Sequence, residues 1–235
     1  MVRVEGLTDR VAVVTGGGRG IGLAIVNALT ANGARVATLD LTPPELDGVL
    51  GIEADVSDEA AVNAAITQVE RELGPVTILV LNAGILPLVP LEETSAELWE
   101  RTLAINLTGS FYASRRVLPG MRKLGYGRVV ALGAAAGKSG GAKSAAYAAS
   151  KAGLMTLAKS IAIEYAPYGI TSNVVAPALI DTQLIGATRE VAGRVPVGRM
   201  GTAEEVAALV AFLVSSEAGY ITGEVVDING GTLID

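Results

Sequence analysis

A run of glycines between an apolar stretch and a helical pattern constrains this chain more than any other feature. Residues 11–15 (V-A-V-V-T) are mostly β-branched and lack polar alternation, as in a strand buried on both faces of a parallel sheet. Residues 16–22 contain five glycines and open a helical pattern that continues to Ala31 and ends at Asn32-Gly33. A strand, a glycine loop and a helix in this order bring backbone N–H groups and the helix dipole to one point. We therefore expect a nucleotide phosphate to bind here, in preference to an ordinary glycine-rich turn.

The remainder of the chain alternates strand-like and helix-like stretches in the same way. Residues 35–40 and 50–54 have strand patterns, and a helical pattern from about residue 58 to 73 is stopped by Gly74-Pro75. Further strand patterns lie, in order, at residues 77–81, 129–132, 170–177 and 224–228, and they are separated by further helical segments. We therefore expect one α/β domain, residues 1–235, built on a parallel sheet.

The composition excludes several classes of function. Half of the 235 residues are hydrophobic, so the chain can bury a large core without disulfides or a structural metal. Cysteine and histidine are both absent, which excludes disulfides, cysteine nucleophiles, Ser-His-Asp triads and the usual zinc sites, and we expect no metal. A net charge of −6 disfavours binding to nucleic acid or to an anionic membrane. Because no signal-like or membrane-spanning run occurs, we expect a cytoplasmic protein.

Tyr147 and Lys151 stand four residues apart in a long stretch of small helical residues that follows a glycine-rich loop. On a helix this spacing places two side chains on one face. An ammonium group beside a phenol favours the phenolate and lowers its pKa, which suits proton exchange with a substrate. A surface tyrosine beside a solvated lysine has the same spacing, so the pair alone leaves both interpretations open.

Asp40 ends the second predicted strand, eighteen residues after Gly22. This is close to the distance at which an acidic residue meets the adenosine ribose of a dinucleotide. A carboxylate there accepts hydrogen bonds from the ribose 2′-OH and repels a 2′-phosphate, which favours NAD over NADP. Arg19, inside the glycine loop, argues the other way, since an arginine near the ribose can accommodate a phosphate. We expect NAD, with NADP as the alternative.

Polar and small residues also follow the other predicted strands. Asp55 and Val56 end the third strand, where the adenine would lie, whereas Asp58 is better explained as a helix cap. Residues 82–84 (N-A-G) end the fourth strand and permit close approach of a ligand, although alone they are only a turn signal. Asn106 lies in an apolar helical face. It is either a satisfied core amide or a helix interruption that exposes a carbonyl and holds a water.

Two apolar segments suggest a substrate site. Residues 85–91 are rich in leucine and proline and either line the site or pack against the next helix. Residues 183–200 have an irregular pattern with glycine and proline, which predicts a short substrate lid. An uncharged, fairly apolar alcohol or ketone would suit the side chains of Leu86, Leu88, Val89, Leu179, Leu184 and Ile185. Arg189 and Arg194 could instead meet an acidic substrate, but as surface charges they are more simply explained by solvation.

Six motifs occur in order along the chain: residues 15–22 (T-G-G-G-R-G-I-G), Asp55-Val56, residues 82–84, Asn106, residues 147–151 (Y-A-A-S-K) and residues 177–182. Together they resemble the short-chain dehydrogenase/reductase family over essentially the whole chain. The resemblance implies a Rossmann-like, doubly wound, seven-stranded parallel sheet of order 3-2-1-4-5-6-7 with helices on both faces. It also implies an NAD(P)-dependent oxidoreductase acting on an alcohol or ketone. A homotetramer is implied as well, built through the long helices around Ala113 and Leu157 and through the C-terminal strand and helix.

The resemblance also implies roles for individual residues. The cofactor would contact Gly16, Arg19, Gly20, Ile21, Gly22, Asp40, Asp55, Val56, Asn82, Ala83, Gly84, Tyr147, Lys151, Pro177, Ile180 and Thr182. Tyr147 would exchange the proton with the substrate oxygen while hydride moves to or from the nicotinamide. Lys151 would bind the nicotinamide ribose and lower the pKa of Tyr147, and Asn106 would hold a water that links Lys151 to solvent.

One position departs from the family pattern. The family normally has a serine thirteen residues before the tyrosine, where it hydrogen-bonds the substrate oxygen, and this chain has Ala134 there. No neighbour is an obvious substitute, because Gly133 and Ala135 have no donor and Ser139 and Ser144 lie at other offsets. By analogy with other lost oxyanion donors, we expect turnover to fall by about 10²–10³-fold while cofactor binding remains.

Three explanations fit this departure. The first is an engineered Ser→Ala change in an otherwise active dehydrogenase, and the retention of Asn106, Tyr147 and Lys151 favours it. The second is a natural enzyme that orients its substrate in another way. The third belongs to a different class, a non-catalytic NAD-binding sensor or scaffold, which would have little reason to keep those three residues.

Overall fold

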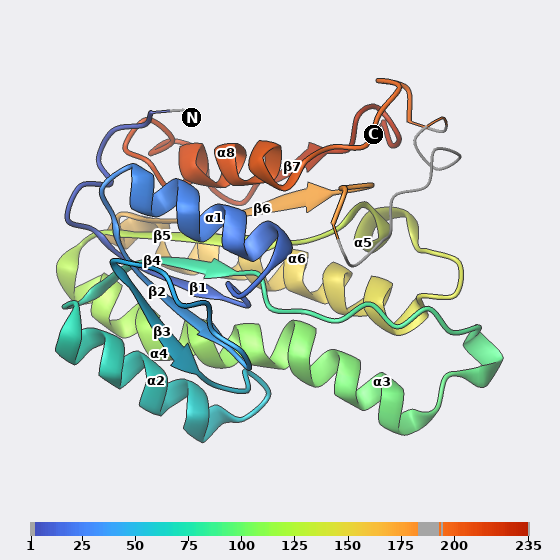
Figure 1. Ribbon diagram of the computed structural model, residues 1–235, viewed down its shortest axis with the longest axis horizontal. Coiled ribbons are helices and arrows are strands. Elements are labelled where there is room, and N and C mark those ends of the chain that lie inside the picture. Colours follow the sequence, from blue (N-terminus) through green and yellow to red (C-terminus); the bar gives the residue numbers. More distant parts are fainter. Residues whose placement is uncertain (1–2, 183–192, 194, 235) are drawn as a thin grey trace.

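Seven parallel strands form one sheet at the centre of the molecule. The computed structural model describes residues 3–182, 193 and 195–234, and across these the strand order is β3-β2-β1-β4-β5-β6-β7 (Figure 1). The strands are β1 (Val11–Thr15), β2 (Arg35–Asp40), β3 (Val49–Glu53), β4 (Val76–Leu81), β5 (Gly127–Leu132), β6 (Ile170–Pro177) and β7 (Val225–Ile228). Each neighbouring pair is parallel. The predicted doubly wound sheet and its strand order are confirmed.

The central strands are buried on both faces, as their unbroken apolar patterns predicted. Every residue of β1, β4, β5 and β6 is buried. Neighbouring side chains of β1 enter different cores, Val13 on one face of the sheet and Ala12 and Val14 on the other. Since successive side chains of a strand point to opposite faces, each face then needs its own cover of helices.

Helices supply that cover on both faces. Helices α1 (Gly20–Ala31) and α8 (Ala203–Leu213) contribute to one core, through side chains such as Ile25 and Val210. The opposite core receives α2 (Glu59–Glu72), α4 (Gly109–Leu124) and α6 (Ala145–Tyr165). Figure 1 shows α1 and α8 on one side of the sheet and α2 and α4 on the other. The shorter helices are η1 (Leu91–Glu93), α3 (Ala96–Leu103), η2 (Ala104–Thr108), α5 (Ala135–Ser139) and η3 (Ala166–Tyr168).

Two local features differ from the sequence prediction. The glycine-rich loop expected between β5 and α6 contains the short helix α5, because small residues let the chain pack closely on α6. A Cβ on Gly137 of α5 would lie 3.0 Å from the backbone N of Ala152. The apolar helical face expected around Asn106 is not a continuous α-helix, because the π-helical turn η2 interrupts it there, and an interruption was one of the two alternatives left open.

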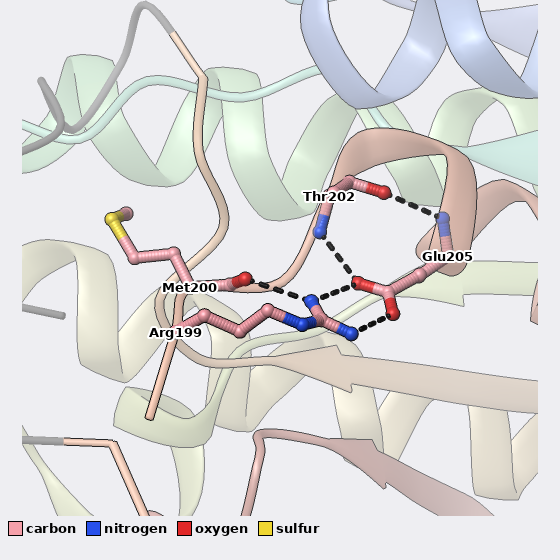
Figure 2. A network of polar contacts seen from close by, with 4 residues as sticks. All are labelled: Arg199, Met200, Thr202 and Glu205. Atoms are coloured by element: carbon pink, nitrogen blue, oxygen red, sulfur yellow. Dashed lines mark hydrogen bonds and ion pairs between the residues drawn. The ribbon is translucent and has the colours of Figure 1, made fainter. Parts of the chain in front are cut away.

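The predicted helix caps are present. Asp58 Oδ1 accepts hydrogen bonds from the backbone N–H groups of Ala60 and Ala61 at 2.8 and 3.3 Å, so its role as a cap of α2 is confirmed. Thr202 and Glu205 form a reciprocal capping box at the start of α8, in which each side chain accepts a hydrogen bond from the other's backbone N–H. Figure 2 shows this box together with the ion pair between Arg199 and Glu205, whose oxygen and nitrogen atoms are 2.6 Å apart.

Both ends of the connection between β6 and α8 are fixed beside each other. Ile180 and Gly201 form a parallel bridge, with Gly201 N donating to Leu179 O and Asp181 N donating to Gly201 O. Val195 and Met200 are buried, and Val197 N donates to Gly230 O, so residues 195–200 pack on the C-terminal segment. Residues 183–192 and 194, most of the predicted lid, lie outside the described residues, and the lid stays a prediction.

Candidate active site

A cavity of about 620 Å³ opens at the carboxyl ends of the parallel strands. Every residue predicted to contact the cofactor lines it: Gly16, Arg19, Gly20, Ile21, Gly22, Asp40, Asp55, Val56, Asn82, Ala83, Gly84, Tyr147, Lys151, Pro177, Ile180 and Thr182. Ala134 lines it too, whereas Asn106 is fully buried behind the wall. Segments far apart in the sequence thus meet at one edge of the sheet, as expected for a ligand crevice in this topology.

Steric constraints fix the glycine loop. Gly16 has a φ of +67°, in the left-handed region, and a Cβ there would lie 2.7 Å from Ala83 Cα. A Cβ on Gly22 would lie 2.0 Å from Gly16 O and 2.5 Å from Asn82 Nδ2. Both distances are too short for any real contact. Only glycine at these positions lets the loop, α1 and the end of β4 pack together.

The start of α1 fits an anion. Arg19 occupies the N-cap position, but no side chain caps the helix there. Gly20 has a φ of +54°, and a Cβ built on it would come no closer than 3.8 Å to any described atom outside its neighbours, namely Thr182 Cγ2. Uncapped N–H groups at a helix N-terminus beside open space form a cradle suited to a phosphate. The residues present therefore fit the pyrophosphate of a dinucleotide.

The Asp40 carboxylate holds the outer part of the same loop. Its Oδ2 accepts a hydrogen bond from Gly18 N at 2.8 Å, and its Oδ1 accepts one from Thr42 N at 3.0 Å. Each carboxylate oxygen keeps a further lone pair that can accept a hydrogen bond from a ribose hydroxyl. Arg19, the residue that argued for a 2′-phosphate, is exposed at the edge of the cavity.

Asn82 and Thr15 tie the glycine loop to the end of β4. Asn82 Nδ2 donates to Thr15 O at 3.1 Å and to Gly16 O at 2.7 Å. Thr15 Oγ1 accepts from the backbone N–H groups of Asn82 and Ala83 at 3.0 and 3.2 Å. The Asn82 side chain therefore organises the cradle. Thr15, for which no separate role was predicted, is equally involved in this link.

Asp55 is occupied within its own turn. Its Oδ1 accepts hydrogen bonds from Ser57 N at 2.9 Å and from Ser57 Oγ at 2.6 Å. The hydroxyl hydrogen bond is the main cause that lowers the pKa of Asp55, and Arg101, 3.6 Å away, acts in the same direction. Val56 is buried against α4, where a Cβ on Gly109 would lie 2.7 Å from Val56 O. The pair shapes the cavity at the end of β3, and its predicted contact with adenine stays a prediction.

Tyr147 and Lys151 lie on one face of α6 and share the cavity wall. Lys151 Nζ is 5.7 Å from the centre of the Tyr147 ring and donates to Leu132 O at 2.6 Å. Burial raises the pKa of Tyr147 to about 12 and lowers the pKa of Lys151 to about 8. For Tyr147 this is opposite to the predicted direction, because removal from water disfavours both the phenolate and the ammonium.

Asn106 combines the two alternatives that its sequence context left open. It lies in the π-helical interruption, and its amide is also fully satisfied. Its Oδ1 accepts from Ile85 N at 2.8 Å, and its Nδ2 donates to Ile85 O and Ser150 Oγ, both at 3.0 Å. Ser150 Oγ in turn donates to Tyr147 O at 2.7 Å. Asn106 thus connects the loop after β4 to the helix that carries Tyr147, and its predicted water stays a prediction.

Ser150 is a site residue that the sequence reasoning missed. Its only signal was its place inside the Tyr147 to Lys151 motif, directly before the lysine. In the structure it is fully buried and bridges Asn106 to the backbone of α6.

Ala134 lies where β5 ends and α5 begins, and it is buried on the cavity wall. Of the two nearby serines, Ser139 is exposed, is not among the residues that line the cavity, and donates within α5 to Ala135 O at 3.2 Å. Ser144 does line the cavity and is only 7% exposed. Ser144 was not an obvious substitute for the family's serine because of its offset, but α5 and the turn after it bring the chain back to the wall.

The predicted apolar wall is present in part. Leu86, Leu88 and Leu179 line the cavity, and Ile85 and Ile105 join them. Val89 is not among the lining residues, and its backbone N donates to Lys143 O at 2.7 Å. The remaining predicted contacts, Leu184, Ile185, Arg189 and Arg194, lie outside the described residues.

Among residues 3–182, 193 and 195–234, no group of three or more Asp and Glu side chains is placed to hold a metal ion. No described helix is long and apolar enough to cross a membrane.

Comparison with known proteins gives a consistent result over nearly the whole chain. A family model described as enoyl-(acyl carrier protein) reductase matches residues 16–232. The 3-oxoacyl-[acyl-carrier-protein] reductase MabA of Mycobacterium avium is 43% identical over 95% of this chain and 89% of its own length. The 3-oxoacyl-[acyl-carrier-protein] reductase FabG of Escherichia coli is 40% identical over 94% of this chain and 96% of its own length.

A solved structure is similar over the same extent. The ligand-free aldohexose dehydrogenase of Thermoplasma acidophilum superposes with a TM-score of 0.93 at 34% identity, covering 97% of this chain and 96% of that one. All of these relatives are named as oxidoreductases, of three kinds. The ordered motifs, the strand order and these whole-length matches show that the chain belongs to the short-chain dehydrogenase/reductase family, whose members use a nicotinamide cofactor.

Proposed function

We propose that this protein is an NAD-dependent oxidoreductase that interconverts a ketone and a secondary alcohol by hydride transfer. The observation that carries the proposal is the position of Tyr147 and Lys151 on the wall of the cavity that the glycine loop opens into. A proton donor and a phosphate cradle in one crevice are what such a reaction requires.

The chain's own groups have distinct roles in this reaction. Tyr147 donates its phenolic proton to the carbonyl oxygen of a ketone and takes it back from an alcohol. The bound nicotinamide supplies or accepts the hydride. The ammonium group of Lys151, 5.7 Å from the centre of the Tyr147 ring, would favour the phenolate that forms, since an opposite charge nearby stabilises it. Asn106 and Ser150 hold the loop after β4 and α6 in place.

Asp40 supports NAD over NADP. Its carboxylate lies against the glycine loop, with Oδ2 2.8 Å from Gly18 N. A 2′-phosphate placed beside it would meet a negative charge, whereas a 2′-hydroxyl would find an acceptor.

A 3-oxoacyl thioester is the substrate class that we propose. The MabA and FabG relatives are named for this substrate, and the apolar side chains of Leu86, Leu88 and Leu179 suit an acyl chain. An aldohexose is a second candidate, supported by the similarity to the aldohexose dehydrogenase.

A panel assay tests the proposal. The purified protein would be mixed with NADH or NADPH and a 3-oxoacyl thioester or an enoyl thioester, and separately with NAD and an aldohexose. We expect oxidation of NADH with the 3-oxoacyl thioester. Tyr147→Phe should lose at least about 10²-fold in turnover with unchanged cofactor affinity. If both the wild type and Ala134→Ser bind NADH but reduce nothing, the protein is a sensor or scaffold instead.

The homotetramer and the cytoplasmic location also remain proposals. In the described residues of the two helices expected to pair, Ala113 faces the core, whereas Phe111 of α4 and Ile163 of α6 are 40% and 81% exposed. Light scattering after gel filtration would give the oligomeric state.

A further inference from the structure

Ser144 is a buried hydroxyl on the cavity wall that the proposed reaction does not yet use. It occupies the N-cap position of α6, but its side chain makes no capping hydrogen bond. Within the described part of the chain, its Oγ has no hydrogen-bond partner of any kind. The residue is only 7% exposed, yet its Oγ is not among the described buried atoms that lack a partner, so the hydroxyl is open to the cavity, where a ligand oxygen can accept its hydrogen bond.

The position of Ser144 relative to the reactive pair is set by α6. Ser144 directly precedes the helix as its N-cap residue, three residues before Tyr147, and Tyr147 and Lys151, four residues apart, lie on one face of α6. All three line the cavity, as does Ala134. The Ser144 hydroxyl therefore shares one cavity wall with the phenol that would exchange the proton.

Two threonines are the other described serine or threonine residues on the wall, and one is hydrogen-bonded while the other lies elsewhere in the cavity. Thr232 Oγ1 donates to Asn229 O at 2.6 Å. Thr182 lies on the side of the glycine loop, where its Cγ2 is 3.8 Å from the Cβ position of Gly20. Among the described serines and threonines on the wall, Ser144 is the one left to meet a substrate oxygen.

The chain around Ser144 keeps this hydroxyl in place. Lys143 adopts a φ of +58°, a left-handed conformation that non-glycine residues rarely take. Its carbonyl accepts from Val89 N at 2.7 Å, which ties the turn to the loop after β4. Opposite the hydroxyl, a Cβ on Gly141 would lie 2.4 Å from Ser144 Oγ, so only glycine leaves this rotamer free.

We propose that Ser144 donates the substrate hydrogen bond that the family's serine would make from position 134. In ketone reduction, the carbonyl carbon receives hydride from the reduced nicotinamide and the carbonyl oxygen receives the proton of Tyr147. Ser144 O–H donates to that oxygen without losing its proton and steadies the charge that develops on it. The inference rests on the proposed function. It means that the hydrogen-bond donor missing at Ala134 is supplied from Ser144 and is not lost.

The test is a set of four variants assayed with NADH and a 3-oxoacyl thioester. Ser144→Ala should lower kcat by about 10²-fold, and Ser139→Ala, the matched control on α5, should leave it unchanged. Ala134→Ser in the Ser144→Ala background should restore kcat to within a few-fold of the wild type. Gly141→Ala, which displaces the hydroxyl, should lower kcat while Ser144 remains.

Two further measurements separate a chemical role from a structural one. Melting temperature and NADH affinity should match the wild type in Ser144→Ala, so that the loss lies in kcat alone. An unchanged kcat in Ser144→Ala, or a loss that Ala134→Ser fails to restore, would overturn the inference. A wild type that is inactive beside an active Ala134→Ser would overturn it while preserving the proposed function. If both are inactive but bind NADH, the proposed function fails and the inference fails with it.

Discussion

The two sides of the cavity are built in different ways. On the side of β1 and α1, the walls are backbone, and position is fixed because a Cβ on Gly16 or Gly22 would overlap neighbouring atoms. On the side of β5 and α6, the walls carry buried side chains, and burial shifts the pKa values of Tyr147 and Lys151 in opposite directions. The first side is shaped by sterics, and the second keeps polar groups out of water at a cost in stability.

This difference separates binding from chemistry. Any side chain added to Gly16 or Gly22 of the cradle would overlap neighbouring atoms. Substitutions there should therefore lower both the stability of the fold and the affinity for the cofactor. A buried ammonium group destabilises the fold while serving the reaction, so its removal should separate the two effects.

The largest effect on activity is expected for Lys151→Met. Turnover should fall by about 10³-fold or more, because the phenolate of Tyr147 loses its neighbouring charge. At neutral pH the variant should also be more stable, by on the order of 1–3 kcal/mol, because folding no longer buries an ammonium group. Chemical denaturation followed by circular dichroism measures the stability.

The burial of Lys151 also predicts how the stability of the wild type changes with pH. Below pH 8 both the folded and the unfolded chain hold the proton on Lys151, and the burial penalty is complete. Between about pH 8 and 10.5 only the unfolded chain holds it, so wild-type stability should rise with pH in that window. Lys151→Met should lack this rise, and Lys159→Met, an exposed lysine of the same helix, should keep it. Parallel pH profiles for all three proteins would contradict the assignment.

Gly22→Ala should have the next largest effect. The added Cβ would lie 2.0 Å from Gly16 O, so the loop must move away from the end of β4. We expect NADH affinity to fall by about 10²-fold and the free energy of unfolding to fall by about 2 kcal/mol or more. Isothermal titration and denaturant unfolding measure the two quantities.

Gly120→Ala is the matched control for this change. Gly120 lies inside α4, and a Cβ there would have no neighbour within 4 Å. It should stabilise the protein by about 0.5–1 kcal/mol and leave NADH affinity unchanged. Equal behaviour of the two alanine variants would refute a steric origin for the cradle.

Asp40→Asn should have the smallest effect, confined to cofactor choice. Asparagine keeps the size of the side chain and one oxygen acceptor but removes the charge that disfavours a 2′-phosphate. The ratio of kcat/KM for NADH over NADPH should fall by about tenfold. Asp47→Asn, an exposed residue with the same change of charge, should not alter the ratio. A wild type that prefers NADPH would show that Arg19 decides instead.

Much of the fold could be predicted because buried parallel strands have a continuous apolar pattern. The bounds of β6 were predicted to the residue, and the α1 side of the site followed from glycines whose steric role is local. The short helix α5 was missed, and the interruption at Asn106 was left as one of two alternatives, because small residues and single amides take their conformation from distant packing. Ser144 was missed for the same reason. It does not stand at the offset of the family's serine, and only the fold shows that its hydroxyl lies on the cavity wall.

The parallel bridge between Ile180 and Gly201 has a consequence for redesign. It holds Ile180 and Gly201 beside each other, and the capping box and the Arg199–Glu205 ion pair lie around Gly201 (Figure 2). The entropy of closing a loop grows slowly with length, by about 0.6 kcal/mol for each doubling. The connection between Ile180 and Gly201 should therefore tolerate exchange for a segment of another length at a small cost in stability. If the proposed lid role holds, exchanging it among relatives should change which substrates react and leave the positions of Tyr147 and Lys151 on α6 unchanged.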